Sequence, residues 1–405
     1  MRTFAFKLAA LSLCVMVIAV PLPRAQQQSN ATKSQPTSAA EDRPLTALPY
    51  SPSLDTTSMD RSVDPCVDLY TYSCGGWMKK NPIPADQASW AVYSKLYDDN
   101  QRFLWGILQD LSQRTSGRTA DQQKIGDYFA ACMDTSAVEK LGLSPLQPRL
   151  NRIAALKSKS DIPGYVGSEH LFSRVYEYGR GSSGTLFRFT SDQDLGNSEQ
   201  VIAYALAGGL GLPDRDYYTK TDEKSQEVRK QYVAHVSRML QLAGELPANA
   251  QRDAATVLRL ETELAKASLT RVEQRDPYKL YHKMTRQQLQ ALTPHFHWNA
   301  YLQAIGYPQL RDFNITEPAF YQEMDRLIAQ SSLADLKAYF RWHLLHENAP
   351  YLSSAFVQED FNFYSRTLRG VQQMPPRWKQ CVRFVNRDLT DPLGRSLLPA
   401  PSRRK

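Results

Sequence analysis

Long stretches with apolar residues at every third or fourth position constrain this chain more than any other feature. One such repeat follows Asp222 and consists of Val228, Tyr232, Val236, Met239 and Ala243. This spacing places the apolar side chains on one face of an α-helix. Similar patterns predict a helix over 248–267 and a further helix, or a pair of helices, over 320–347. The last one should end before Pro350, because the residue that precedes a proline is disfavoured in helical geometry.

The N-terminal half adds two helical segments and one β element. Helical spacing extends over 93–112 and continues in 124–132, whereas 165–189 mixes aromatic residues, valine and glycine. Within that stretch, 185–190 could form one strand of a small hairpin whose turn is the Gly/Ser cluster of 179–184. No internal repeat of fixed period is present. The sequence therefore predicts a mainly α fold: a large multi-helix domain with a small β-hairpin element.

The first 25 residues have the form of a secretory signal peptide. Arg2 and Lys7 precede an apolar run over 8–20, and Pro-Leu-Pro-Arg-Ala ends at Ala25, where we expect cleavage. The apolar run is short for a bilayer span. A lipoprotein signal through Cys14 and an uncleaved membrane anchor are the alternatives. The protein is thus expected to be secreted or periplasmic, or else anchored in the membrane through its N-terminal segment.

Residues 26–62 are rich in Gln, Ser, Thr, Ala and Pro, which predicts a disordered linker. The formal net charge of +8 is concentrated at the two ends of the chain. Three basic residues lie in the signal peptide and three more form Arg403-Arg404-Lys405, so the body carries only +2. A nucleic-acid-binding surface would show clustered Lys/Arg stripes, and the sequence has none. Nucleic acid is therefore not an expected partner.

Four cysteines follow the signal peptide: Cys66, Cys74, Cys132 and Cys381. Export would place them in an oxidising compartment, where disulfides persist. Four cysteines permit three pairings, and the spacing alone does not choose among them. None belongs to a C-x-x-C pair, so a thiolate zinc site has no support.

No catalytic motif emerges from the histidines. A zinc peptidase needs H-E-x-x-H on a helix, which places two imidazoles beside a glutamate base, and none of the seven histidines begins that motif. The nearest pattern is His343-Leu-Leu-His346-Glu347, which also differs from H-x-x-E-H. Its neighbours are apolar and aromatic, so both histidines should pack within a helix bundle. His295 and His297 are expected to be an incidental surface pair.

Other polar patterns have simple structural interpretations. The glycine-rich run of 208–211 lacks the following Lys-Ser/Thr of a phosphate-binding loop. Glu261 and Glu263 lie beside Arg259 and Lys266, which offer ordinary ion pairs. We therefore predict no catalytic residue, no metal ligand and no cofactor in this chain.

Six stretches, in the same order, resemble the neprilysin/endothelin-converting-enzyme family of zinc metallopeptidases. The first reads D-P-C-V-D-L-Y-T-Y-S-C-G-G-W and continues to Trp90; the six stretches are 64–90, 132–142, 197–218, 260–281, 342–356 and 376–382. The resemblance extends from about residue 63 to 391. It implies a large helical domain that, in complete members, covers a zinc domain and restricts entry to short peptides.

The resemblance also implies roles for individual residues. Cys132 would pair with Cys381, whereas Cys66 and Cys74 match cysteines that normally bridge to the catalytic domain, and here they should be free, mispaired or joined to each other. Ser89 occupies the position of an arginine that can bind a peptide's terminal carboxylate through its bidentate fork. We therefore expect this carboxylate position to be lost.

The resulting map has five parts. A signal peptide (1–25) and a linker (26–62) precede a neprilysin-like N-terminal domain (63–391), divided into an arm (63–123) and a helical lid (124–391). The arm should be weakly anchored, because its large apolar residues would face a zinc domain: Leu69, Tyr70, Tyr72, Trp77, Trp90 and Tyr93. Residues 392–405 form a tail unlike the family, which a frameshift or premature stop would produce.

The function hypothesis is the non-catalytic N-terminal domain of a secreted neprilysin-like zinc metalloendopeptidase, in a truncated and inactive form. The alternative is a peptide-binding or partner-complementing module that works with a separately encoded zinc domain. An active peptidase with a cryptic site ranks third. Expected partners are short peptides or such a zinc domain, with no membrane span beyond the signal peptide.

Overall fold

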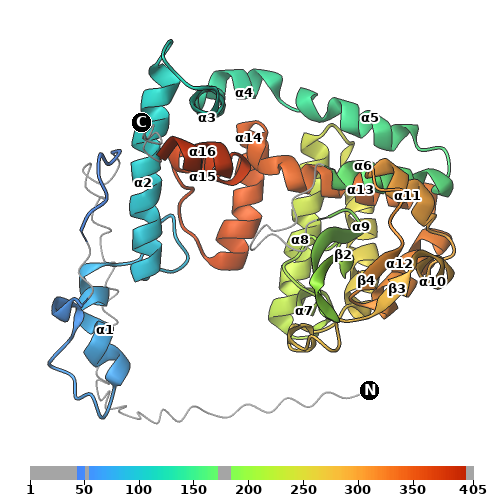
Figure 1. The fold of residues 1–405 in the computed structure, drawn as a ribbon, viewed down its shortest axis with the longest axis horizontal. Coiled ribbons are helices and arrows are strands. Elements are labelled where there is room, and N and C mark those ends of the chain that lie inside the picture. Colours follow the sequence, from blue (N-terminus) through green and yellow to red (C-terminus); the bar gives the residue numbers. More distant parts are fainter. Residues whose placement is uncertain (1–42, 51–53, 172–183, 398–405) are drawn as a thin grey trace, which may run out of the picture. The chain divides into compact units, whose positions relative to one another are not determined.

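The computed structural model describes residues 43–50, 54–171 and 184–397, and Figure 1 shows the order of its elements. The predicted signal peptide and most of the predicted linker lie outside the described residues, as do residues 179–183 of the Gly/Ser cluster. The part of the linker that is described includes a 3-10 turn over Thr56–Ser58.

Helices make up most of the described chain, which confirms the predicted fold class. Their bounds are α1 (Leu69–Lys80), α2 (Val92–Gln113), α3 (Ala120–Met133), α4 (Thr135–Leu141), α5 (Gln147–Ala155), α6 (Ile162–His170), α7 (Asp216–Thr219), α8 (Glu223–Leu242), α9 (Pro247–Ala267), α10 (Arg286–Leu292), α11 (Trp298–Ala304), α12 (Pro318–Gln330), α13 (Leu333–Asn348), α14 (Ser354–Asp360), α15 (Arg377–Asp388) and α16 (Thr390–Leu397). The predicted helices correspond to α2, α3, α8 and α9, and the region 320–347 is a pair, α12 and α13.

Side-chain caps fix several helix starts. Asp222 accepts a hydrogen bond from the Ser225 N–H at the start of α8, and Thr119 forms a capping box with Gln122 at the start of α3. Each cap satisfies an N–H group that the first helical turn leaves without a partner. α13 ends at Asn348, two residues before Pro350, as the proline predicted.

The β element is a four-stranded sheet, larger than the predicted hairpin. Its strands are β1 (Phe187–Asp194), β2 (Asn197–Ala207), β3 (Lys283–Thr285) and β4 (Asp312–Ile315), in the order β1-β2-β4-β3. β1 and β2 are antiparallel, β2 and β4 are parallel, and β3 and β4 are antiparallel.

The predicted hairpin turn of 179–184 falls on residues that, except for Gly184, the structure does not describe. Among the described residues, β1 pairs with β2, the strand that follows it, through a turn at Leu195-Gly196. A Cβ at Gly196 would lie 2.3 Å from the Tyr281 hydroxyl, so the turn approaches a distant segment closely. The Asp194 carboxylate accepts a hydrogen bond from the Gly196 N–H at 2.9 Å, whereas the contact with Tyr281 is a tertiary one that the local pattern does not contain.

The larger of two hydrophobic cores, here called the lid core, lies among α5–α14 and the sheet. Its centre is aromatic: Phe187 packs against Phe296, Trp298, Tyr301 and Tyr321 with ring centroids 5.2–5.6 Å apart. Such tilted and edge-to-face pairs add to the free energy gained from burial alone. This core holds the sheet against the long helices.

The smaller core, here called the clamp core, joins segments from both ends of the described chain. It is formed by α2, α3, α15 and α16, and its buried residues are Leu108, Leu111, Ile125, Phe129, Trp378, Cys381, Val382, Val385 and Leu393. The second half of α2 therefore packs on helices within this chain. The predicted boundary between arm and lid, at residue 123, falls in the first turns of α3, and α3 packs against α2.

Candidate functional site

The first half of α2 and the region before it expose large apolar side chains. We call these residues the arm surface: Val67, Leu69, Tyr70, Ile83, Val92, Tyr93, Leu96 and Tyr97, whose exposed fractions range from 49% to 85%. On α2 they recur at positions that share one helix face. Extensive exposed apolar surface on a folded domain is typical of a surface that contacts a protein, a membrane or a ligand.

Three other aromatic residues of the predicted arm are better covered. Tyr72, Trp77 and Trp90 are half-buried. The linker segment covers part of α1, since the Asp60 N–H donates to the Tyr72 carbonyl at 2.7 Å. Gly76 permits this approach, because a Cβ there would lie 2.7 Å from the Met59 carbonyl oxygen.

Ser89 lies exposed in the loop that joins α1 to α2. A serine hydroxyl has no positive charge and no planar pair of donors, so it does not reproduce the bidentate fork of arginine. The loop therefore carries no cation at the position where the resemblance implies a carboxylate-binding residue.

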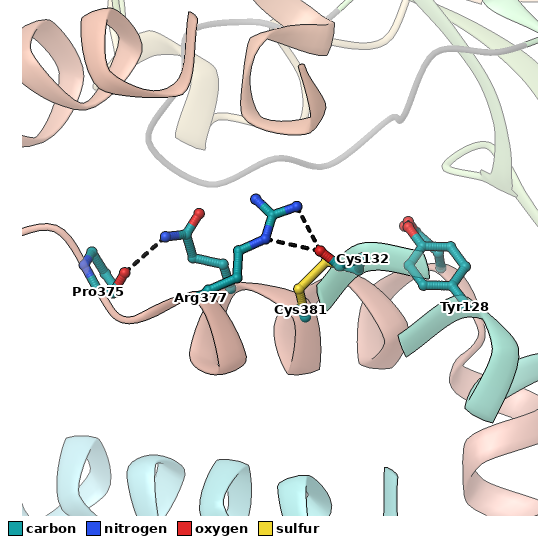
Figure 2. Close-up of a disulfide and its surroundings, with 7 residues drawn as sticks. Tyr128, Cys132, Pro375, Arg377 and Cys381 are labelled. Atoms are coloured by element: carbon teal, nitrogen blue, oxygen red, sulfur yellow. Dashed lines mark hydrogen bonds between the residues drawn. A yellow bond between two sulfur atoms is a disulfide. The ribbon is translucent and has the colours of Figure 1, made fainter. Parts of the chain in front are cut away.

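A disulfide joins Cys132 at the end of α3 to Cys381 in α15, with a Cα–Cα distance of 5.7 Å. Figure 2 shows the guanidinium of Arg377 directed at the Cys132 carbonyl oxygen, to which it donates two hydrogen bonds of 2.9 and 2.7 Å. Burial lowers the pKa of Arg377, although the nearby Glu139 carboxylate opposes this shift. The covalent bond and the guanidinium together fasten α3 to α15.

The other two described cysteines are free thiols on the arm. Cys66 is exposed just before α1, and Cys74 is half-buried within α1. Both belong to the same region as the arm surface, where a partner could reach them.

The histidine pair of α13 does not form a metal site. His343 and His346 are both buried within the helix bundle, as their apolar neighbours predicted. The His346 ring stacks on Trp342 and packs against Tyr364, at centroid distances of 5.3 and 4.9 Å. Throughout the described ranges, no three His, Cys, Asp or Glu side chains gather in a way that could hold a metal ion. These residues do not fit zinc.

His343 instead faces a buried carboxylate, and here the sequence-based expectation for Glu261 is wrong. Glu261 is fully buried; its oxygens accept hydrogen bonds from the Tyr218 and Tyr232 hydroxyls at 2.8 Å, and His343 Nε2 lies 2.9 Å from Oε1. Burial raises the pKa of both tyrosines well above the usual value, and the charge of Glu261 adds to this effect.

The Glu261 cluster also explains the glycine-rich run. The Gly211 N–H donates to Glu261 at 3.2 Å, and a Cβ on Gly211 would lie 2.0 Å from the Tyr232 hydroxyl. The run of 208–211 is thus a turn that packs against buried tyrosines, in agreement with the structural interpretation of its sequence.

His295 and His297 are both exposed, as predicted, but His295 is not an incidental residue. Its Nδ1 lies 2.7 Å from the largely buried carboxylate of Asp325, which additionally accepts the backbone N–H groups of His295 and Phe296. His297 precedes α11 as its N-cap residue. The pairing of His295 with Asp325 depends on packing that the local sequence does not show.

Comparison with known proteins agrees with this architecture. The N-terminal model of peptidase family M13 matches residues 65–398. Endothelin-converting enzyme 1 of Bos taurus is 28% identical over 351 residues, which cover 84% of this chain and 45% of that protein. Membrane metallo-endopeptidase-like 1 of Homo sapiens is 27% identical over 356 residues, covering 83% of this chain and 45% of that protein.

A solved structure shows the same relationship. The Mycobacterium tuberculosis zinc metalloprotease Zmp1, in complex with an inhibitor, aligns with a TM-score of 0.77 and 30% identity, over 85% of this chain and 51% of that chain. This chain therefore spans about half the length of the relatives it matches. With a family model that matches most of the sequence, a common order of elements and a closely similar fold, the chain belongs to peptidase family M13.

Proposed function

We propose that this chain is the non-catalytic half of a neprilysin-like zinc metalloendopeptidase and that its arm surface binds a zinc domain of the same family. The observation that carries the proposal is the exposure of the apolar residues on α1, the following loop and the first turns of α2. In this assignment the helices of the lid core cover the zinc domain and limit access to short peptides.

The chain by itself should not hydrolyse peptides. Its 405 residues contain no H-E-x-x-H, which in a zinc peptidase supplies two ligands and the glutamate base that activates water. The residues nearest to that pattern, His343 and His346, are buried among aromatic side chains and Glu261. The zinc domain must therefore supply the reacting groups.

Export from the cytoplasm is part of the proposal. The first 25 residues have the pattern of a signal peptide, and a disulfide between Cys132 and Cys381 is typical of oxidising compartments. No helix within the described ranges is both long enough and apolar enough to cross a bilayer. We therefore expect the protein to act after secretion or in the periplasm.

A complementation experiment tests the proposal. The purified chain would be mixed with an M13 zinc domain that carries H-E-x-x-H, with the zinc half of Zmp1 as the first probe. We expect binding, together with peptide hydrolysis that a chelator abolishes. Tyr93→Asp should weaken binding at least tenfold, because it places a charge on an apolar contact; this corresponds to about 1.4 kcal/mol.

Tyr278 offers a matched control. Its side chain is 89% exposed, close to the 85% of Tyr93, but it lies far along the chain, in the segment between α9 and β3. Tyr278→Asp should leave binding unchanged. Chelator-sensitive hydrolysis by the homogeneous chain alone would sink the proposal, and equal effects of the two substitutions would remove the arm surface from it.

A further inference from the structure

The loop between α1 and α2, residues 81–91, has a defined shape although it contains no helix or strand. A turn closes where the Gln87 N–H donates to the Pro84 carbonyl at 3.0 Å. The Ala85 carbonyl accepts two further hydrogen bonds, from the N–H groups of Gln372 and Gln373 at 3.1 and 2.9 Å. A segment nearly 290 residues further along the chain therefore holds the middle of this loop.

Lys379 in the first turn of α15 reinforces the same attachment. Its Nζ lies 2.8 Å from a carboxylate oxygen of Asp86 in the loop and 2.7 Å from one of Asp98 in α2. The side chains of Lys379, Asp86 and Asp98 are only 13%, 13% and 22% exposed. Charge-assisted hydrogen bonds at this depth are stronger than those at an open surface.

The ammonium group of Lys379 stays charged in this site. Burial alone would lower the pKa of Lys379, but the hydrogen bonds with Asp86 and Asp98 outweigh that effect, and the pKa is raised. Removing the lysine would leave two partly buried carboxylates on the two sides of its position. They would repel each other, and Asp86 would lose its attachment to α15.

The support that carries Lys379 is rigid. The preceding residue, Trp378, stacks on Trp105 of α2 with a centroid distance of 4.2 Å and an interplanar angle of 8°. Two residues beyond Lys379, Cys381 is bonded to Cys132, and Arg377 holds the Cys132 carbonyl. The clamp core thus fixes the position of the Lys379 ammonium group. Of the two carboxylates bound to this group, only that of Asp86 belongs to the loop.

From this geometry we infer that Lys379 is a positioning residue. It holds the loop of residues 81–91 in the conformation in which the arm surface can bind a zinc domain. Ile83 of the arm surface and Ser89 both lie in this loop and are exposed. Val92 and Tyr93 follow immediately at the start of α2. The expected effect on binding to a zinc domain rests on the proposed function, whereas the attachment of the loop by Lys379 does not depend on it.

Hydrogen exchange on the full chain tests the attachment. Lys379→Met should raise the exchange rates of the Gln87, Gln372 and Gln373 amides by about tenfold or more. A tenfold increase corresponds to the lower end of the free energies expected for the loss of a hydrogen bond to a charged group. Lys379→Arg, which keeps the charge, should restore most of the protection. Lys95→Met is the matched control. It removes a more exposed lysine, which pairs with Asp99 within α2, and it leaves the attachment of the loop to α15 intact.

A double substitution separates positioning from general stability. If Lys379 acts through Asp86, then Asp86→Asn should loosen the same three amides, and adding Lys379→Met to it should have little further effect. Asp86→Asn also serves where Lys379→Met fails to fold. Unchanged protection of the three amides in folded Lys379→Met would overturn the inference, as would equal loosening of the lid core.

Binding to the zinc domain tests the consequence. We expect Lys379→Met to weaken the binding several-fold and Lys379→Arg to restore it, with Lys95→Met unchanged. If the loop loosens and the affinity does not change, the docking consequence is wrong and the attachment stands. If even the unmodified chain does not bind a zinc domain, the proposed function fails, and the exchange experiment still decides whether Lys379 holds the loop.

Discussion

The two halves of α2 differ sharply although they belong to one continuous helix. In the second half, Leu108 and Leu111 are buried against α3, α15 and α16. In the first half, Val92, Tyr93 and Leu96 are at least 49% exposed. The apolar spacing is similar in both halves, but among the described residues only the apolar side chains of the second half are covered.

This difference shows what an amphipathic pattern contains. The pattern predicts that a helix has an apolar face, and it does not identify the element that covers this face. In the second half of α2 the cover comes from α15, more than 260 residues later in the sequence. In the first half the apolar face is available to another domain, which is the basis of the proposed function.

Removal of the disulfide should affect the buried half of α2 most strongly. The bond closes a loop of 249 residues, and the chain-entropy model assigns such a loop about 5 kcal/mol of stabilisation. The double variant Cys132→Ser/Cys381→Ser should therefore unfold its clamp core before its lid core. Amide hydrogen exchange in α15 and in α9 of the lid core, followed through a denaturant series, would separate the two events. A single coincident transition at the original denaturant midpoint would contradict this expectation.

A pair of leucine substitutions compares the two halves directly. Leu108→Ala removes a fully buried side chain and should lower the free energy of unfolding by about 2–5 kcal/mol. Leu96→Ala, at a side chain that is 49% exposed, should change it by no more than about 0.5 kcal/mol. Urea denaturation measures both values. Similar losses would mean that the first half of α2 is covered within the chain after all.

Acidification should act on the lid core rather than on the clamp core. His170 fits its site as a neutral ring, with one nitrogen 3.0 Å from the Thr185 carbonyl and the other 2.8 Å from the Tyr301 hydroxyl. Burial lowers the pKa of His170 from 6.5 to about 4, so the unfolded chain binds a proton at higher pH than the folded chain. The stabilisation is present above pH 6.5 and should fall by about 3 kcal/mol as the pH decreases towards 4.

The control for this prediction is His170→Gln, whose stability should depend less steeply on pH between 6.5 and 4. Burial also lowers the pKa of His235, with Glu359 opposing the shift, so some loss of the same sign should persist. None of the seven histidines belongs to the clamp core. Faster amide exchange in α15 that precedes the unfolding of the lid core at acid pH would count against this assignment.

The smallest effect on folding is expected at the tip of the arm surface. Tyr93→Ser removes an aromatic ring that is 85% exposed, so the free energy of unfolding should stay within about 0.5 kcal/mol of the original. Binding of a hydrophobic dye to the folded chain should decrease, because exposed apolar area is lost. Chemical denaturation and dye fluorescence check the two parts, and a clear loss of stability would indicate a covering element for Tyr93.

Most helices could be predicted because they depend on local repeats. α8 and α9 start and end within a residue or two of the periodic segments, and α13 ends where Pro350 requires it. The sheet could not be predicted in this way. β4 is only four residues long and lies parallel to β2, more than a hundred residues away, so its pairing depends on the assembled lid core.

In the candidate site too, some features can be predicted from the sequence and others cannot. The absence of H-E-x-x-H, the apolar residues of the arm and the neutral Ser89 are properties of the sequence. By contrast, Glu261 looked like a surface carboxylate with basic neighbours and is instead enclosed by Tyr218, Tyr232 and His343. A buried carboxylate and an exposed one can have the same local sequence, because tertiary packing determines which groups surround it.

The sequence by itself determined the helical fold class, the family and the lack of the family's zinc-binding motif in these residues, because periodicity and motifs are local. The tertiary structure decided which half of α2 is buried, where the hairpin turns and how Lys379 reaches Asp86 across 293 positions. The burial of α2 and the contact of Lys379 arise only when segments from the two ends of the described chain meet in the clamp core, whereas the hairpin turn packs against Tyr281. Residues so far apart in sequence carry no local signal of their contact, since each could have packed elsewhere.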